Sequence, residues 1–472
     1  MNLGRTRRIH FVGVGGIGMS GIAELLANLG YAVSGSDAKR SGVTDRLASL
    51  GVTVATAGHA AVNVGNADVV VYSSAVRPDN PEVVEARARR IPVIPRAEML
   101  AELMRLRFGI AVAGAHGKTS TTSMIALVLD RAGLDPTAVI GGRLSAFGSN
   151  ARLGRGEYMV AEADESDRSF LKLSPAVAVI TNIDREHMDA YGGFADLQQA
   201  FVDFANKVPF YGAVVACADD AELAHVLPRF TRRVVTYGIE GAFDLSATGV
   251  VLEGFGSHCT VVQRDLHAER ATELGRLTLA VPGLHSVRNA LAAVAVGLEL
   301  EVPFAKIAAA LAGFHGAERR FERRGIVNGI SVVDDYGHHP TEIAAVLSAA
   351  RAARPARIVV AFQPHRYTRT RDLMAEFGAA LAAADEVVLT DIYAASEEPI
   401  AGITVEALAA AVSAGRDRPA HVVKRLDDVA AAVAKLARPG DLVLTLGAGS
   451  IGGLATALLA ELERRHGPRE AR

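Results

Sequence analysis

The chain has few cysteines, no excess of charge of one sign and no long apolar run. Only Cys217 and Cys259 occur in 472 residues, which argues against a disulfide framework and is typical of a reducing cytosol. The 50 basic and 52 acidic residues leave a formal net charge of −2, which argues against a nucleic-acid or membrane-surface partner. No apolar run is long enough for a membrane span, and no signal peptide is recognised. We therefore expect a cytoplasmic protein that binds small molecules, does not insert into a membrane and does not bind nucleic acid. Whether it forms a homodimer is left open.

The sequence also lacks internal repeats and low-complexity linkers, and its length suits about three domains. Apolar strand-like runs alternate with helical patterns along the whole chain, which is typical of parallel α/β domains. The pattern divides into three blocks, and we expect domains over residues 1–107, 108–317 and 318–472.

The most informative segment is a glycine-rich turn between an expected strand, Ile110–Ala113, and an expected helix, Thr121–Arg131. Backbone N–H groups, a helix N-terminus, a lysine and a hydroxyl residue in this order form a phosphate cradle for a nucleotide and Mg²⁺. The spacing departs from the common motif, because Val112 stands where a glycine is usual. An ordinary strand-to-helix turn is the alternative. The residues predicted to contact ATP here are Gly114, Ala115, His116, Gly117, Lys118, Thr119 and Ser120.

A second glycine motif, Gly13-x-Gly15-x-x-Gly18, follows the first expected strand, and Asp37 ends the next one. This pattern matches a dinucleotide-binding fingerprint, so an NAD-dependent oxidoreductase is one hypothesis. The motif itself indicates only a close approach of backbone to a diphosphate, and a UDP-sugar carries one too. Gly447-x-Gly449-x-x-Gly452 has the same spacing, and we interpret it as a strand-to-helix turn.

Acidic residues follow the expected strand Tyr158–Ala161, and Glu162 lies nearest its end. Ligands of parallel sheets gather at the carboxyl ends of strands, so Glu162 is the best Mg²⁺ candidate. His187 follows the next strand, although Mg²⁺ prefers oxygen ligands. Thr119, Glu162 and His187 are therefore the candidate metal site. A solvated acidic turn and an ordinary loop histidine are the alternatives.

The third block has two polar loops that follow strands, Asp334–Pro340 and Gln363–Arg369. Both should lie at one edge of the sheet. Arginine forks suit a carboxylate or a phosphate, so this edge predicts a small anionic substrate, with a solvated basic loop as the alternative. Arg319 and Arg320 lie at the domain junction, where an arginine can reach a γ-phosphate or serve only as a hinge residue.

Taken together and in order along the chain, these motifs resemble the Mur ligases, most closely their alanine-adding branch. The resemblance implies three domains, a Rossmann-like UDP-binding domain, a central P-loop-type ATPase α/β domain and a C-terminal Rossmann-like domain for the amino acid. The departures are Ala115 in place of the usual threonine, Arg168 in place of a small residue, and Arg185-Glu186 before the histidine. Later ligases of the family use a modified lysine, and Tyr191–Asn206 contains none. The motifs that carry the resemblance are His10–Gly21, Gly114–Thr122, Glu162–Asp167, Thr181–Asp184, His187–Asp189, His285–Asn289, Asp334–Glu342 and Phe362–Thr370.

The resemblance implies that ATP phosphorylates the lactyl carboxylate of UDP-N-acetylmuramic acid and that the amine of L-alanine displaces the phosphate, in peptidoglycan precursor synthesis. It assigns catalysis to Lys118, Glu162, His187 and Arg320, the nucleotide to the loop above with His285, Asn289, Arg320 and Asp335, and the magnesium to Thr119, Glu162 and His187. It assigns the UDP-sugar to Gly13, Gly15, Gly16, Gly18, Ser36, Asp37 and Ser73, and the amino acid to Tyr336, His338, His365, Arg366 and Arg369. Two alternatives remain, the NAD-dependent oxidoreductase and a non-catalytic nucleotide-dependent switch.

Overall fold

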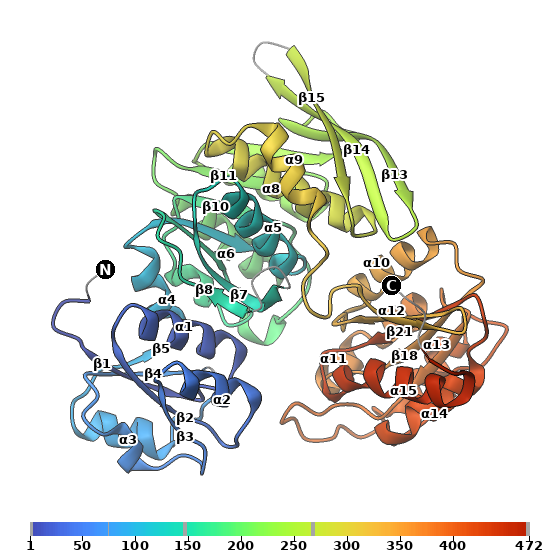
Figure 1. The fold of residues 1–472 in the computed structure, drawn as a ribbon, viewed down its shortest axis with the longest axis horizontal. Helices are drawn as coiled ribbons and strands as arrows, with labels where there is room; N and C mark the ends of the chain where they lie inside the picture. The colour runs from blue at the N-terminus through green and yellow to red at the C-terminus, as the bar shows by residue number, and fades with distance from the viewer. Residues whose placement is uncertain (1–2, 74, 145–148, 266–269, 469–472) are drawn as a thin grey trace. The chain divides into compact units, whose positions relative to one another are not determined.

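The computed structural model describes residues 3–73, 75–144, 149–265 and 270–468, which form a mixed α/β protein with three sheets (Figure 1). Contacts divide the chain into two units. One holds Met1–Gly249, Cys259–Leu277 and Arg288–Phe314, and the other holds Val250–His258, Thr278–Val287 and His315–Arg472. The boundaries predicted at residues 107 and 317 lie between successive sheets, but the two units do not follow them, so they stay predictions.

The first sheet has five parallel strands in the order β3-β2-β1-β4-β5. Phe11 on β1 and Val71 on β4 are fully buried, as expected for strands covered by helices on both faces. The strands are β1 (Arg8–Val12), β2 (Ala32–Ser36), β3 (Thr53–Ala55), β4 (Val69–Tyr72) and β5 (Val93–Pro95), and the helices are α1 (Ile17–Asn28), α2 (Gly42–Ser49), α3 (Pro81–Ala88) and α4 (Arg96–Met104).

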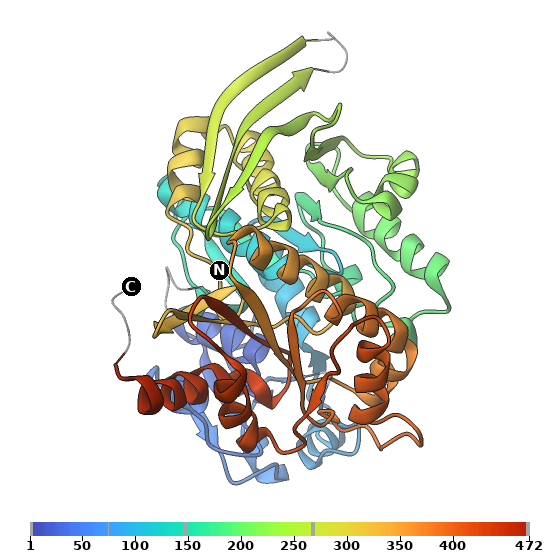
Figure 2. The ribbon, with the colours of Figure 1, turned by 90° about the vertical axis from the view of Figure 1, so that its right-hand side faces the viewer.

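The second sheet has ten strands in the order β15-β14-β13-β12-β11-β10-β6-β9-β7-β8. Its central strand β6 pairs in parallel with β9 and β10, so the loops that follow these three strands leave the same edge. Figures 1 and 2 show β14 and β15 as a long ribbon at the end of this sheet. The strands are β6 (Phe108–Ala113), β7 (Thr137–Leu144), β8 (Ser149–Arg152), β9 (Tyr158–Glu162), β10 (Val177–Ile180), β11 (Ala213–Cys217), β12 (Val234–Ile239), β13 (Leu245–Glu253), β14 (Gly256–Asp265) and β15 (Arg270–Leu279), and the helices are α5 (Lys118–Arg131), α6 (Phe194–Asn206), α7 (Ala221–Val226), α8 (Leu284–Glu299) and α9 (Phe304–Ala312).

The third sheet has six strands in the order β16-β17-β21-β18-β19-β20. It is covered on its two faces by separate apolar clusters, one around Phe362 and Phe377 and one around Val359 and Leu458. The strands are β16 (Glu322–Val327), β17 (Ile330–Asp335), β18 (Arg357–Phe362), β19 (Glu386–Leu389), β20 (His421–Val422) and β21 (Asp441–Leu446), and the helices are α10 (Pro340–Ala352), α11 (Tyr367–Asp372), α12 (Met374–Leu381), α13 (Val405–Ser413), α14 (Leu426–Leu436) and α15 (Leu454–His466).

The expectation of parallel sheets holds for the strand pairs at the centre of each sheet and is wrong in places elsewhere, as two antiparallel pairs show. β8 pairs antiparallel with β7, and β16 pairs antiparallel with β17. Both exceptions join neighbours in the chain through a short connection, which an antiparallel pair allows and a parallel pair does not.

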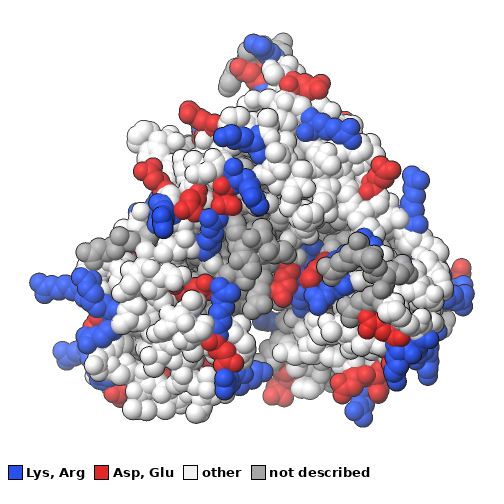
Figure 3. All heavy atoms as spheres, in the orientation of Figure 1, with Lys and Arg blue, Asp and Glu red and all other residues white. Residues whose placement is uncertain are grey.

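Among the described residues, no helix has both the length and the apolar character that crossing a bilayer requires. On the face shown in Figure 3, basic and acidic side chains are interspersed over the described surface.

Candidate functional site

The phosphate loop between β6 and α5 depends on two glycines with positive φ. Gly114 has φ 136°, and a Cβ placed there would collide with Thr181. Gly117 has φ 82° and is the N-cap of α5, and a Cβ there would come within 2.7 Å of Asn289 Oδ1. The loop therefore has the tight turn and the helix N-terminus that a phosphate cradle needs. Asn289, predicted to contact the nucleotide, is buried beside it.

The segment Thr181–Asp184, after β10, holds this loop from one side. Asn182 accepts a hydrogen bond from the His116 N–H at 2.8 Å and donates one to the His116 carbonyl at 3.0 Å. The Thr181 hydroxyl donates to the same carbonyl at 2.6 Å, and His116 Nε2 lies 2.8 Å from Asp184 Oδ2. This segment was recognised as a motif, but its role as the support of the loop was not predicted.

The Lys118 ammonium points back onto its own loop and onto the acidic turn after β9. It donates to the carbonyls of Gly114 at 2.6 Å and Ala115 at 3.1 Å, and to Glu165 at 2.9 Å. Burial alone would lower the pKa of Lys118, but Glu165 and Asp164 outweigh it and raise the pKa, so the ammonium stays charged. Sequence reasoning missed Glu165 as the partner of Lys118.

The predicted metal ligands lie at the same edge of the second sheet. Thr119 is buried in the first turn of α5, and Glu162 ends β9 opposite Val112 of β6. Glu162 Oε1 accepts a hydrogen bond from the Gly141 N–H at 2.7 Å, which fixes the carboxylate. A hydroxyl and a carboxylate are oxygen ligands of the kind that Mg²⁺ prefers, so these residues fit the ion.

His187 belongs to a second group of ligand atoms in the same region. One ligand atom each from Glu165, Glu186 and His187 lie within 4.8 Å of one another. The backbone of His187 is left-handed, with φ 55°. The roles assigned to Thr119, Glu162 and His187 remain predictions.

In the first sheet, the glycine motif lies at the end of β1, as predicted. Gly13 has φ 80° and lies near Ser73, and Gly16 is the N-cap of α1. The Gly15 N–H donates to Asp37 Oδ2 at 2.8 Å, so Asp37 supports the turn. Gly18 lies against Arg96, which pairs with Asp164 at 3.3 Å.

Ser36, whose contact with the UDP-sugar remains a prediction, is part of a buried polar group. Its hydroxyl donates to Glu82 at 2.6 Å and lies 2.9 Å from His59 Nδ1. Glu82 is fully buried and also contacts His10 at 3.2 Å and Asn63 at 2.7 Å. Burial alone would raise the pKa of Glu82, but these hydrogen bonds outweigh it and lower the pKa to about 2. The carboxylate is therefore charged and holds β1, β2 and α3 together.

At the start of the third sheet, the two adjacent arginines differ. Arg319 is tied to Asp334 at 2.8 Å and to the Gly447 carbonyl at 2.7 Å. Arg320 lies over the Tyr336 ring at 5.2 Å and contacts Glu342 at 3.5 Å. Arg319 is thus held by a buried carboxylate and a backbone carbonyl, as a structural residue is.

Asp335, predicted to bind the ribose, uses both carboxylate oxygens on the backbone. They accept hydrogen bonds from the Phe321 N–H at 2.7 Å and the Gly337 N–H at 2.6 Å. Burial raises the pKa of Asp335 to about 6, with Arg320 opposing the rise. The structure shows Asp335 shaping its own loop, and its contact with ribose remains a prediction.

The residues predicted to bind the amino acid come together at the carboxyl ends of β17 and β18. The His338 ring lies 5.4 Å from Tyr336 and 5.8 Å from His365, and His365 stacks on Tyr393 at 5.4 Å. Burial and the nearby cations lower the pKa of His365 to about 4, so its imidazole is neutral at neutral pH. Tyr393 was not predicted, because it follows β19 in a segment without a motif.

Arg366 and Arg369 lie at the start of α11, next to this ring cluster. Arg366 has φ 72°, a strained value for a side-chain-bearing residue, and lies 4.0 Å from Glu397. Glu397 also accepts hydrogen bonds from the N–H and hydroxyl of Thr368 at 3.0 and 2.7 Å. The predicted basic surface therefore contains an acid that the sequence did not indicate.

Two further predictions concern residues outside these clusters. His285 lies in the first turns of α8, against Gly283. The turn at Gly447–Gly452 follows β21 and leads through a short 3₁₀ turn into α15, which confirms the interpretation as a strand-to-helix turn.

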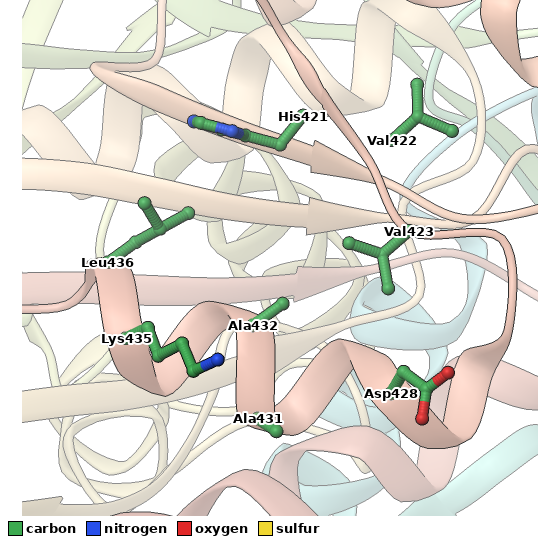
Figure 4. Close-up of a pocket in the computed structure, with 8 residues that line it drawn as sticks. All are labelled: His421, Val422, Val423, Asp428, Ala431, Ala432, Lys435 and Leu436. Atoms are coloured by element: carbon green, nitrogen blue, oxygen red, sulfur yellow. The ribbon is translucent and has the colours of Figure 1, made fainter.

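A pocket of about 510 Å³ contains none of the predicted site residues (Figure 4). It lies between β20 and α14 at the edge of the third sheet and is lined by His421, Val422, Val423, Asp428, Ala431, Ala432, Lys435 and Leu436. Its walls are mostly aliphatic.

Comparison with known proteins gives the family. Residues 8–108 match the model described as Mur ligase family, catalytic domain, residues 112–297 the Mur ligase middle domain, and residues 319–449 the Mur ligase, glutamate ligase domain. These three matches in succession agree with a three-domain architecture.

Relatives match over nearly the full chain. A UDP-N-acetylmuramate–L-alanine ligase of Geobacter sp. (strain M21) is 54% identical over 98% of each chain. That of Anaeromyxobacter dehalogenans (strain 2CP-C) is 56% identical over 98% of this chain and 100% of its own. The crystal structure of the Thermotoga maritima UDP-N-acetylmuramate–alanine ligase superposes with a TM-score of 0.81 and 30% identity over 97% of this chain and 99% of its own. The comparisons lend no support to the oxidoreductase hypothesis. The chain belongs to the Mur ligase family.

Proposed function

We propose that this protein is an ATP-dependent ligase that joins L-alanine to the lactyl carboxylate of UDP-N-acetylmuramate. The observation that carries the proposal is the identity of 54% over 98% of both chains with a relative of that name. The proposal is supported by the geometry, because a nucleotide-type phosphate loop lies in the second sheet, and the third sheet carries a cluster of aromatic and histidine rings with Arg366 beside it.

The reaction needs two steps because a carboxylate is a poor electrophile. In the first, a carboxylate oxygen attacks the γ-phosphorus of ATP and ADP leaves. In the second, the alanine nitrogen attacks the carbonyl carbon of the acyl phosphate, inorganic phosphate leaves and the nitrogen loses a proton. Two anions must approach each other in the first step, so cations have to neutralise them.

The second sheet supplies these cations. The charged Lys118 ammonium is the resident one. Thr119 and Glu162 would hold a magnesium ion, and His187 would help to hold a second; bound magnesium supplies charge neutralisation at the phosphates. Arg320 would reach the transferred phosphoryl group.

The remaining roles follow the same division of the chain. The first sheet, with the turn at Gly13–Gly18 and Asp37, would hold the UDP moiety. Asn289 and His285 would contact the adenine. Tyr336, His338 and His365 would face the amino acid, with Arg366 and Arg369 on its carboxylate. The proposed domains remain residues 1–107, 108–317 and 318–472.

The product would be a precursor of peptidoglycan, which connects the protein to cell-wall synthesis, cell shape and cell division. We place the reaction in the cytoplasm, where ATP and UDP-sugars are made.

The test is an ADP-release assay coupled to mass spectrometry of the product. We expect turnover only when UDP-N-acetylmuramate, L-alanine and Mg-ATP are all present, with a product heavier than the UDP-sugar by one alanine residue. Glycine, L-serine and D-alanine are the matched arms for specificity. Nucleotide binding without an amide product in every arm would contradict the ligase and support a nucleotide-dependent switch, and oxidation of NADH without ATP would support a dehydrogenase.

A further inference from the structure

The buried carboxylate of Glu165 contacts Lys118, the lysine of the phosphate loop. Its side chain is almost fully buried, and its oxygens lie 2.9 Å from Lys118 Nζ. A lysine ammonium has three protons to donate. The three acceptors are Glu165 and the carbonyls of Gly114 and Ala115, so every proton is already used. The phosphates of a nucleotide can bind Lys118 only by displacing one or more of these acceptors.

Glu165 is the fixed member of the pair. Its backbone carbonyl accepts hydrogen bonds from the Tyr191 hydroxyl at 2.5 Å and from the Arg168 N–H at 3.1 Å. The Arg168 guanidinium lies over the Tyr191 ring at 4.9 Å and pairs with Asp196 at 2.5 Å. The turn is therefore held from behind, whereas Lys118 reaches it through a flexible four-carbon side chain.

The energetic cost of displacement differs between the acceptors. Separating Lys118 from Glu165 would leave a buried carboxylate uncompensated, which is strongly unfavourable. Releasing the two loop carbonyls exchanges neutral acceptors for charged phosphate oxygens, which are stronger acceptors. Phosphate should therefore replace the carbonyls and leave the ion pair intact.

We propose that Glu165 is a positioning residue for catalysis: it stays paired with Lys118 when the nucleotide binds and aims the ammonium at the phosphates. The inference rests on the proposed function only in that the loop binds ATP. The partner that the proposal gives Glu165 is Lys118; a role at a metal, which Glu165 would share with the nearby Glu186 and His187, is distinguished by the test below.

The test compares Glu165→Gln, which keeps the shape and removes the charge, with Glu165→Asp, which keeps the charge on a shorter arm. Glu157→Gln is the matched control, since Glu157 lies exposed just before the other end of β9 and loses the same charge. We expect kcat to fall about ten- to a hundredfold in Glu165→Gln, the range for losing a hydrogen bond to a charged group. The KM for ATP should change less than about threefold, because both forms keep Lys118. Glu165→Asp should recover part of kcat, and Glu157→Gln should match the wild type.

Two outcomes would overturn the proposal. Unchanged kcat with tighter ATP binding in Glu165→Gln would mean that Glu165 only competes with the nucleotide for Lys118 and separates from Lys118 once the nucleotide is bound. A rise in the magnesium concentration needed for half-maximal activity would mean that Glu165 acts on the metal; we expect that concentration to change less than about twofold. If Glu165→Gln fails to fold, Glu165→Asp decides, since wild-type kcat in that folded variant also contradicts positioning. A wild-type protein that forms no amide would instead refute the proposed function.

Discussion

Asn182 and His116 are joined by two hydrogen bonds that run in opposite directions, 2.8 Å from the His116 N–H to the Asn182 side chain and 3.0 Å from that side chain back to the His116 carbonyl. An amide side chain bonded in this way offers the same donor and acceptor that the backbone of a neighbouring strand would offer. It connects the loop after β6 to the loop after β10 and so fixes the middle of the phosphate cradle.

We therefore expect Asn182→Ala to weaken ATP binding by up to about thirtyfold, since two hydrogen bonds worth about 1 kcal/mol each are lost beside the nucleotide. Isothermal titration with a non-hydrolysable ATP analogue measures this. Asn206→Ala is the control, because Asn206 also makes several hydrogen bonds, to Thr231 and Arg229, but at the end of α6. Equal affinities in the two variants would show that Asn182 does not shape the site.

Gly117 and Gly133 offer a matched pair of glycines. Their φ angles are 82° and 85°, so alanine is strained at both and should cost about 1–2 kcal/mol of stability. A Cβ at Gly117 also meets Asn289, whereas one at Gly133 meets nothing within 4 Å. Gly117→Ala should thus lower both the melting temperature and nucleotide affinity, and Gly133→Ala only the former. A loss of affinity in Gly133→Ala would mean that backbone strain alone explains the effect.

Variants of Arg319 and Arg320 should differ in their effects, one on the stability of the fold and the other on the rate of the reaction. Arg319→Ala removes a buried partner of Asp334, so we expect a loss of about 3 kcal/mol in the stability of the unit that contains it. Arg320→Ala should leave the melting temperature within about 2 °C and lower kcat about a hundredfold or more, as for the loss of one group that stabilises transition-state charge. Thermal melting and the ADP-release assay give both quantities. The reverse pattern would exchange the two roles.

The buried Glu82 gives a pH-dependent stability. Its pKa in the folded protein is about 2, below the usual value near 4.5, so the folded state favours the carboxylate. The stabilisation is complete above about pH 4.5 and is lost as the pH falls toward 2, and it amounts to about 3 kcal/mol. Glu82→Gln should therefore be less stable than the wild type at pH 7, and the difference should shrink between pH 4.5 and 3.

Amide hydrogen exchange in β1 and β4 would report this difference locally. Asp45→Asn is a suitable control, because Asp45 is an exposed acid of the same sheet domain, paired with Arg40. A difference between Glu82→Gln and the wild type that does not change with pH would show that the carboxylate is not the source of the stabilisation.

Much of the fold followed from the sequence where the signal is local. The strands predicted over Ile110–Ala113 and Tyr158–Ala161 lie within β6 and β9, because parallel strands buried on both faces are continuous apolar runs. β3 and β5 were missed, since three residues are too few to show a period. β16 was missed because its sequence, Glu322–Val327, is mostly polar or glycine.

The candidate site divides in the same way. The loop at Gly114–Thr119 was found because one short segment carries all its chemistry. The Lys118–Glu165 pair was not, since 47 residues separate its members and only the order of the strands brings them together. The contact of Ser36 with Glu82 was not predicted either, because it depends on a helix 46 residues away.

The pairing of Lys118 with Glu165 has a consequence for selectivity among anions. A loop whose only ammonium is already neutralised presents little unpaired positive charge to a lone phosphate or sulfate ion. A triphosphate can compensate for the exchange with the rest of its contacts, whereas a small ion cannot. We therefore expect inorganic phosphate, including the phosphate that the reaction releases, to compete only weakly with the nucleotide at this loop.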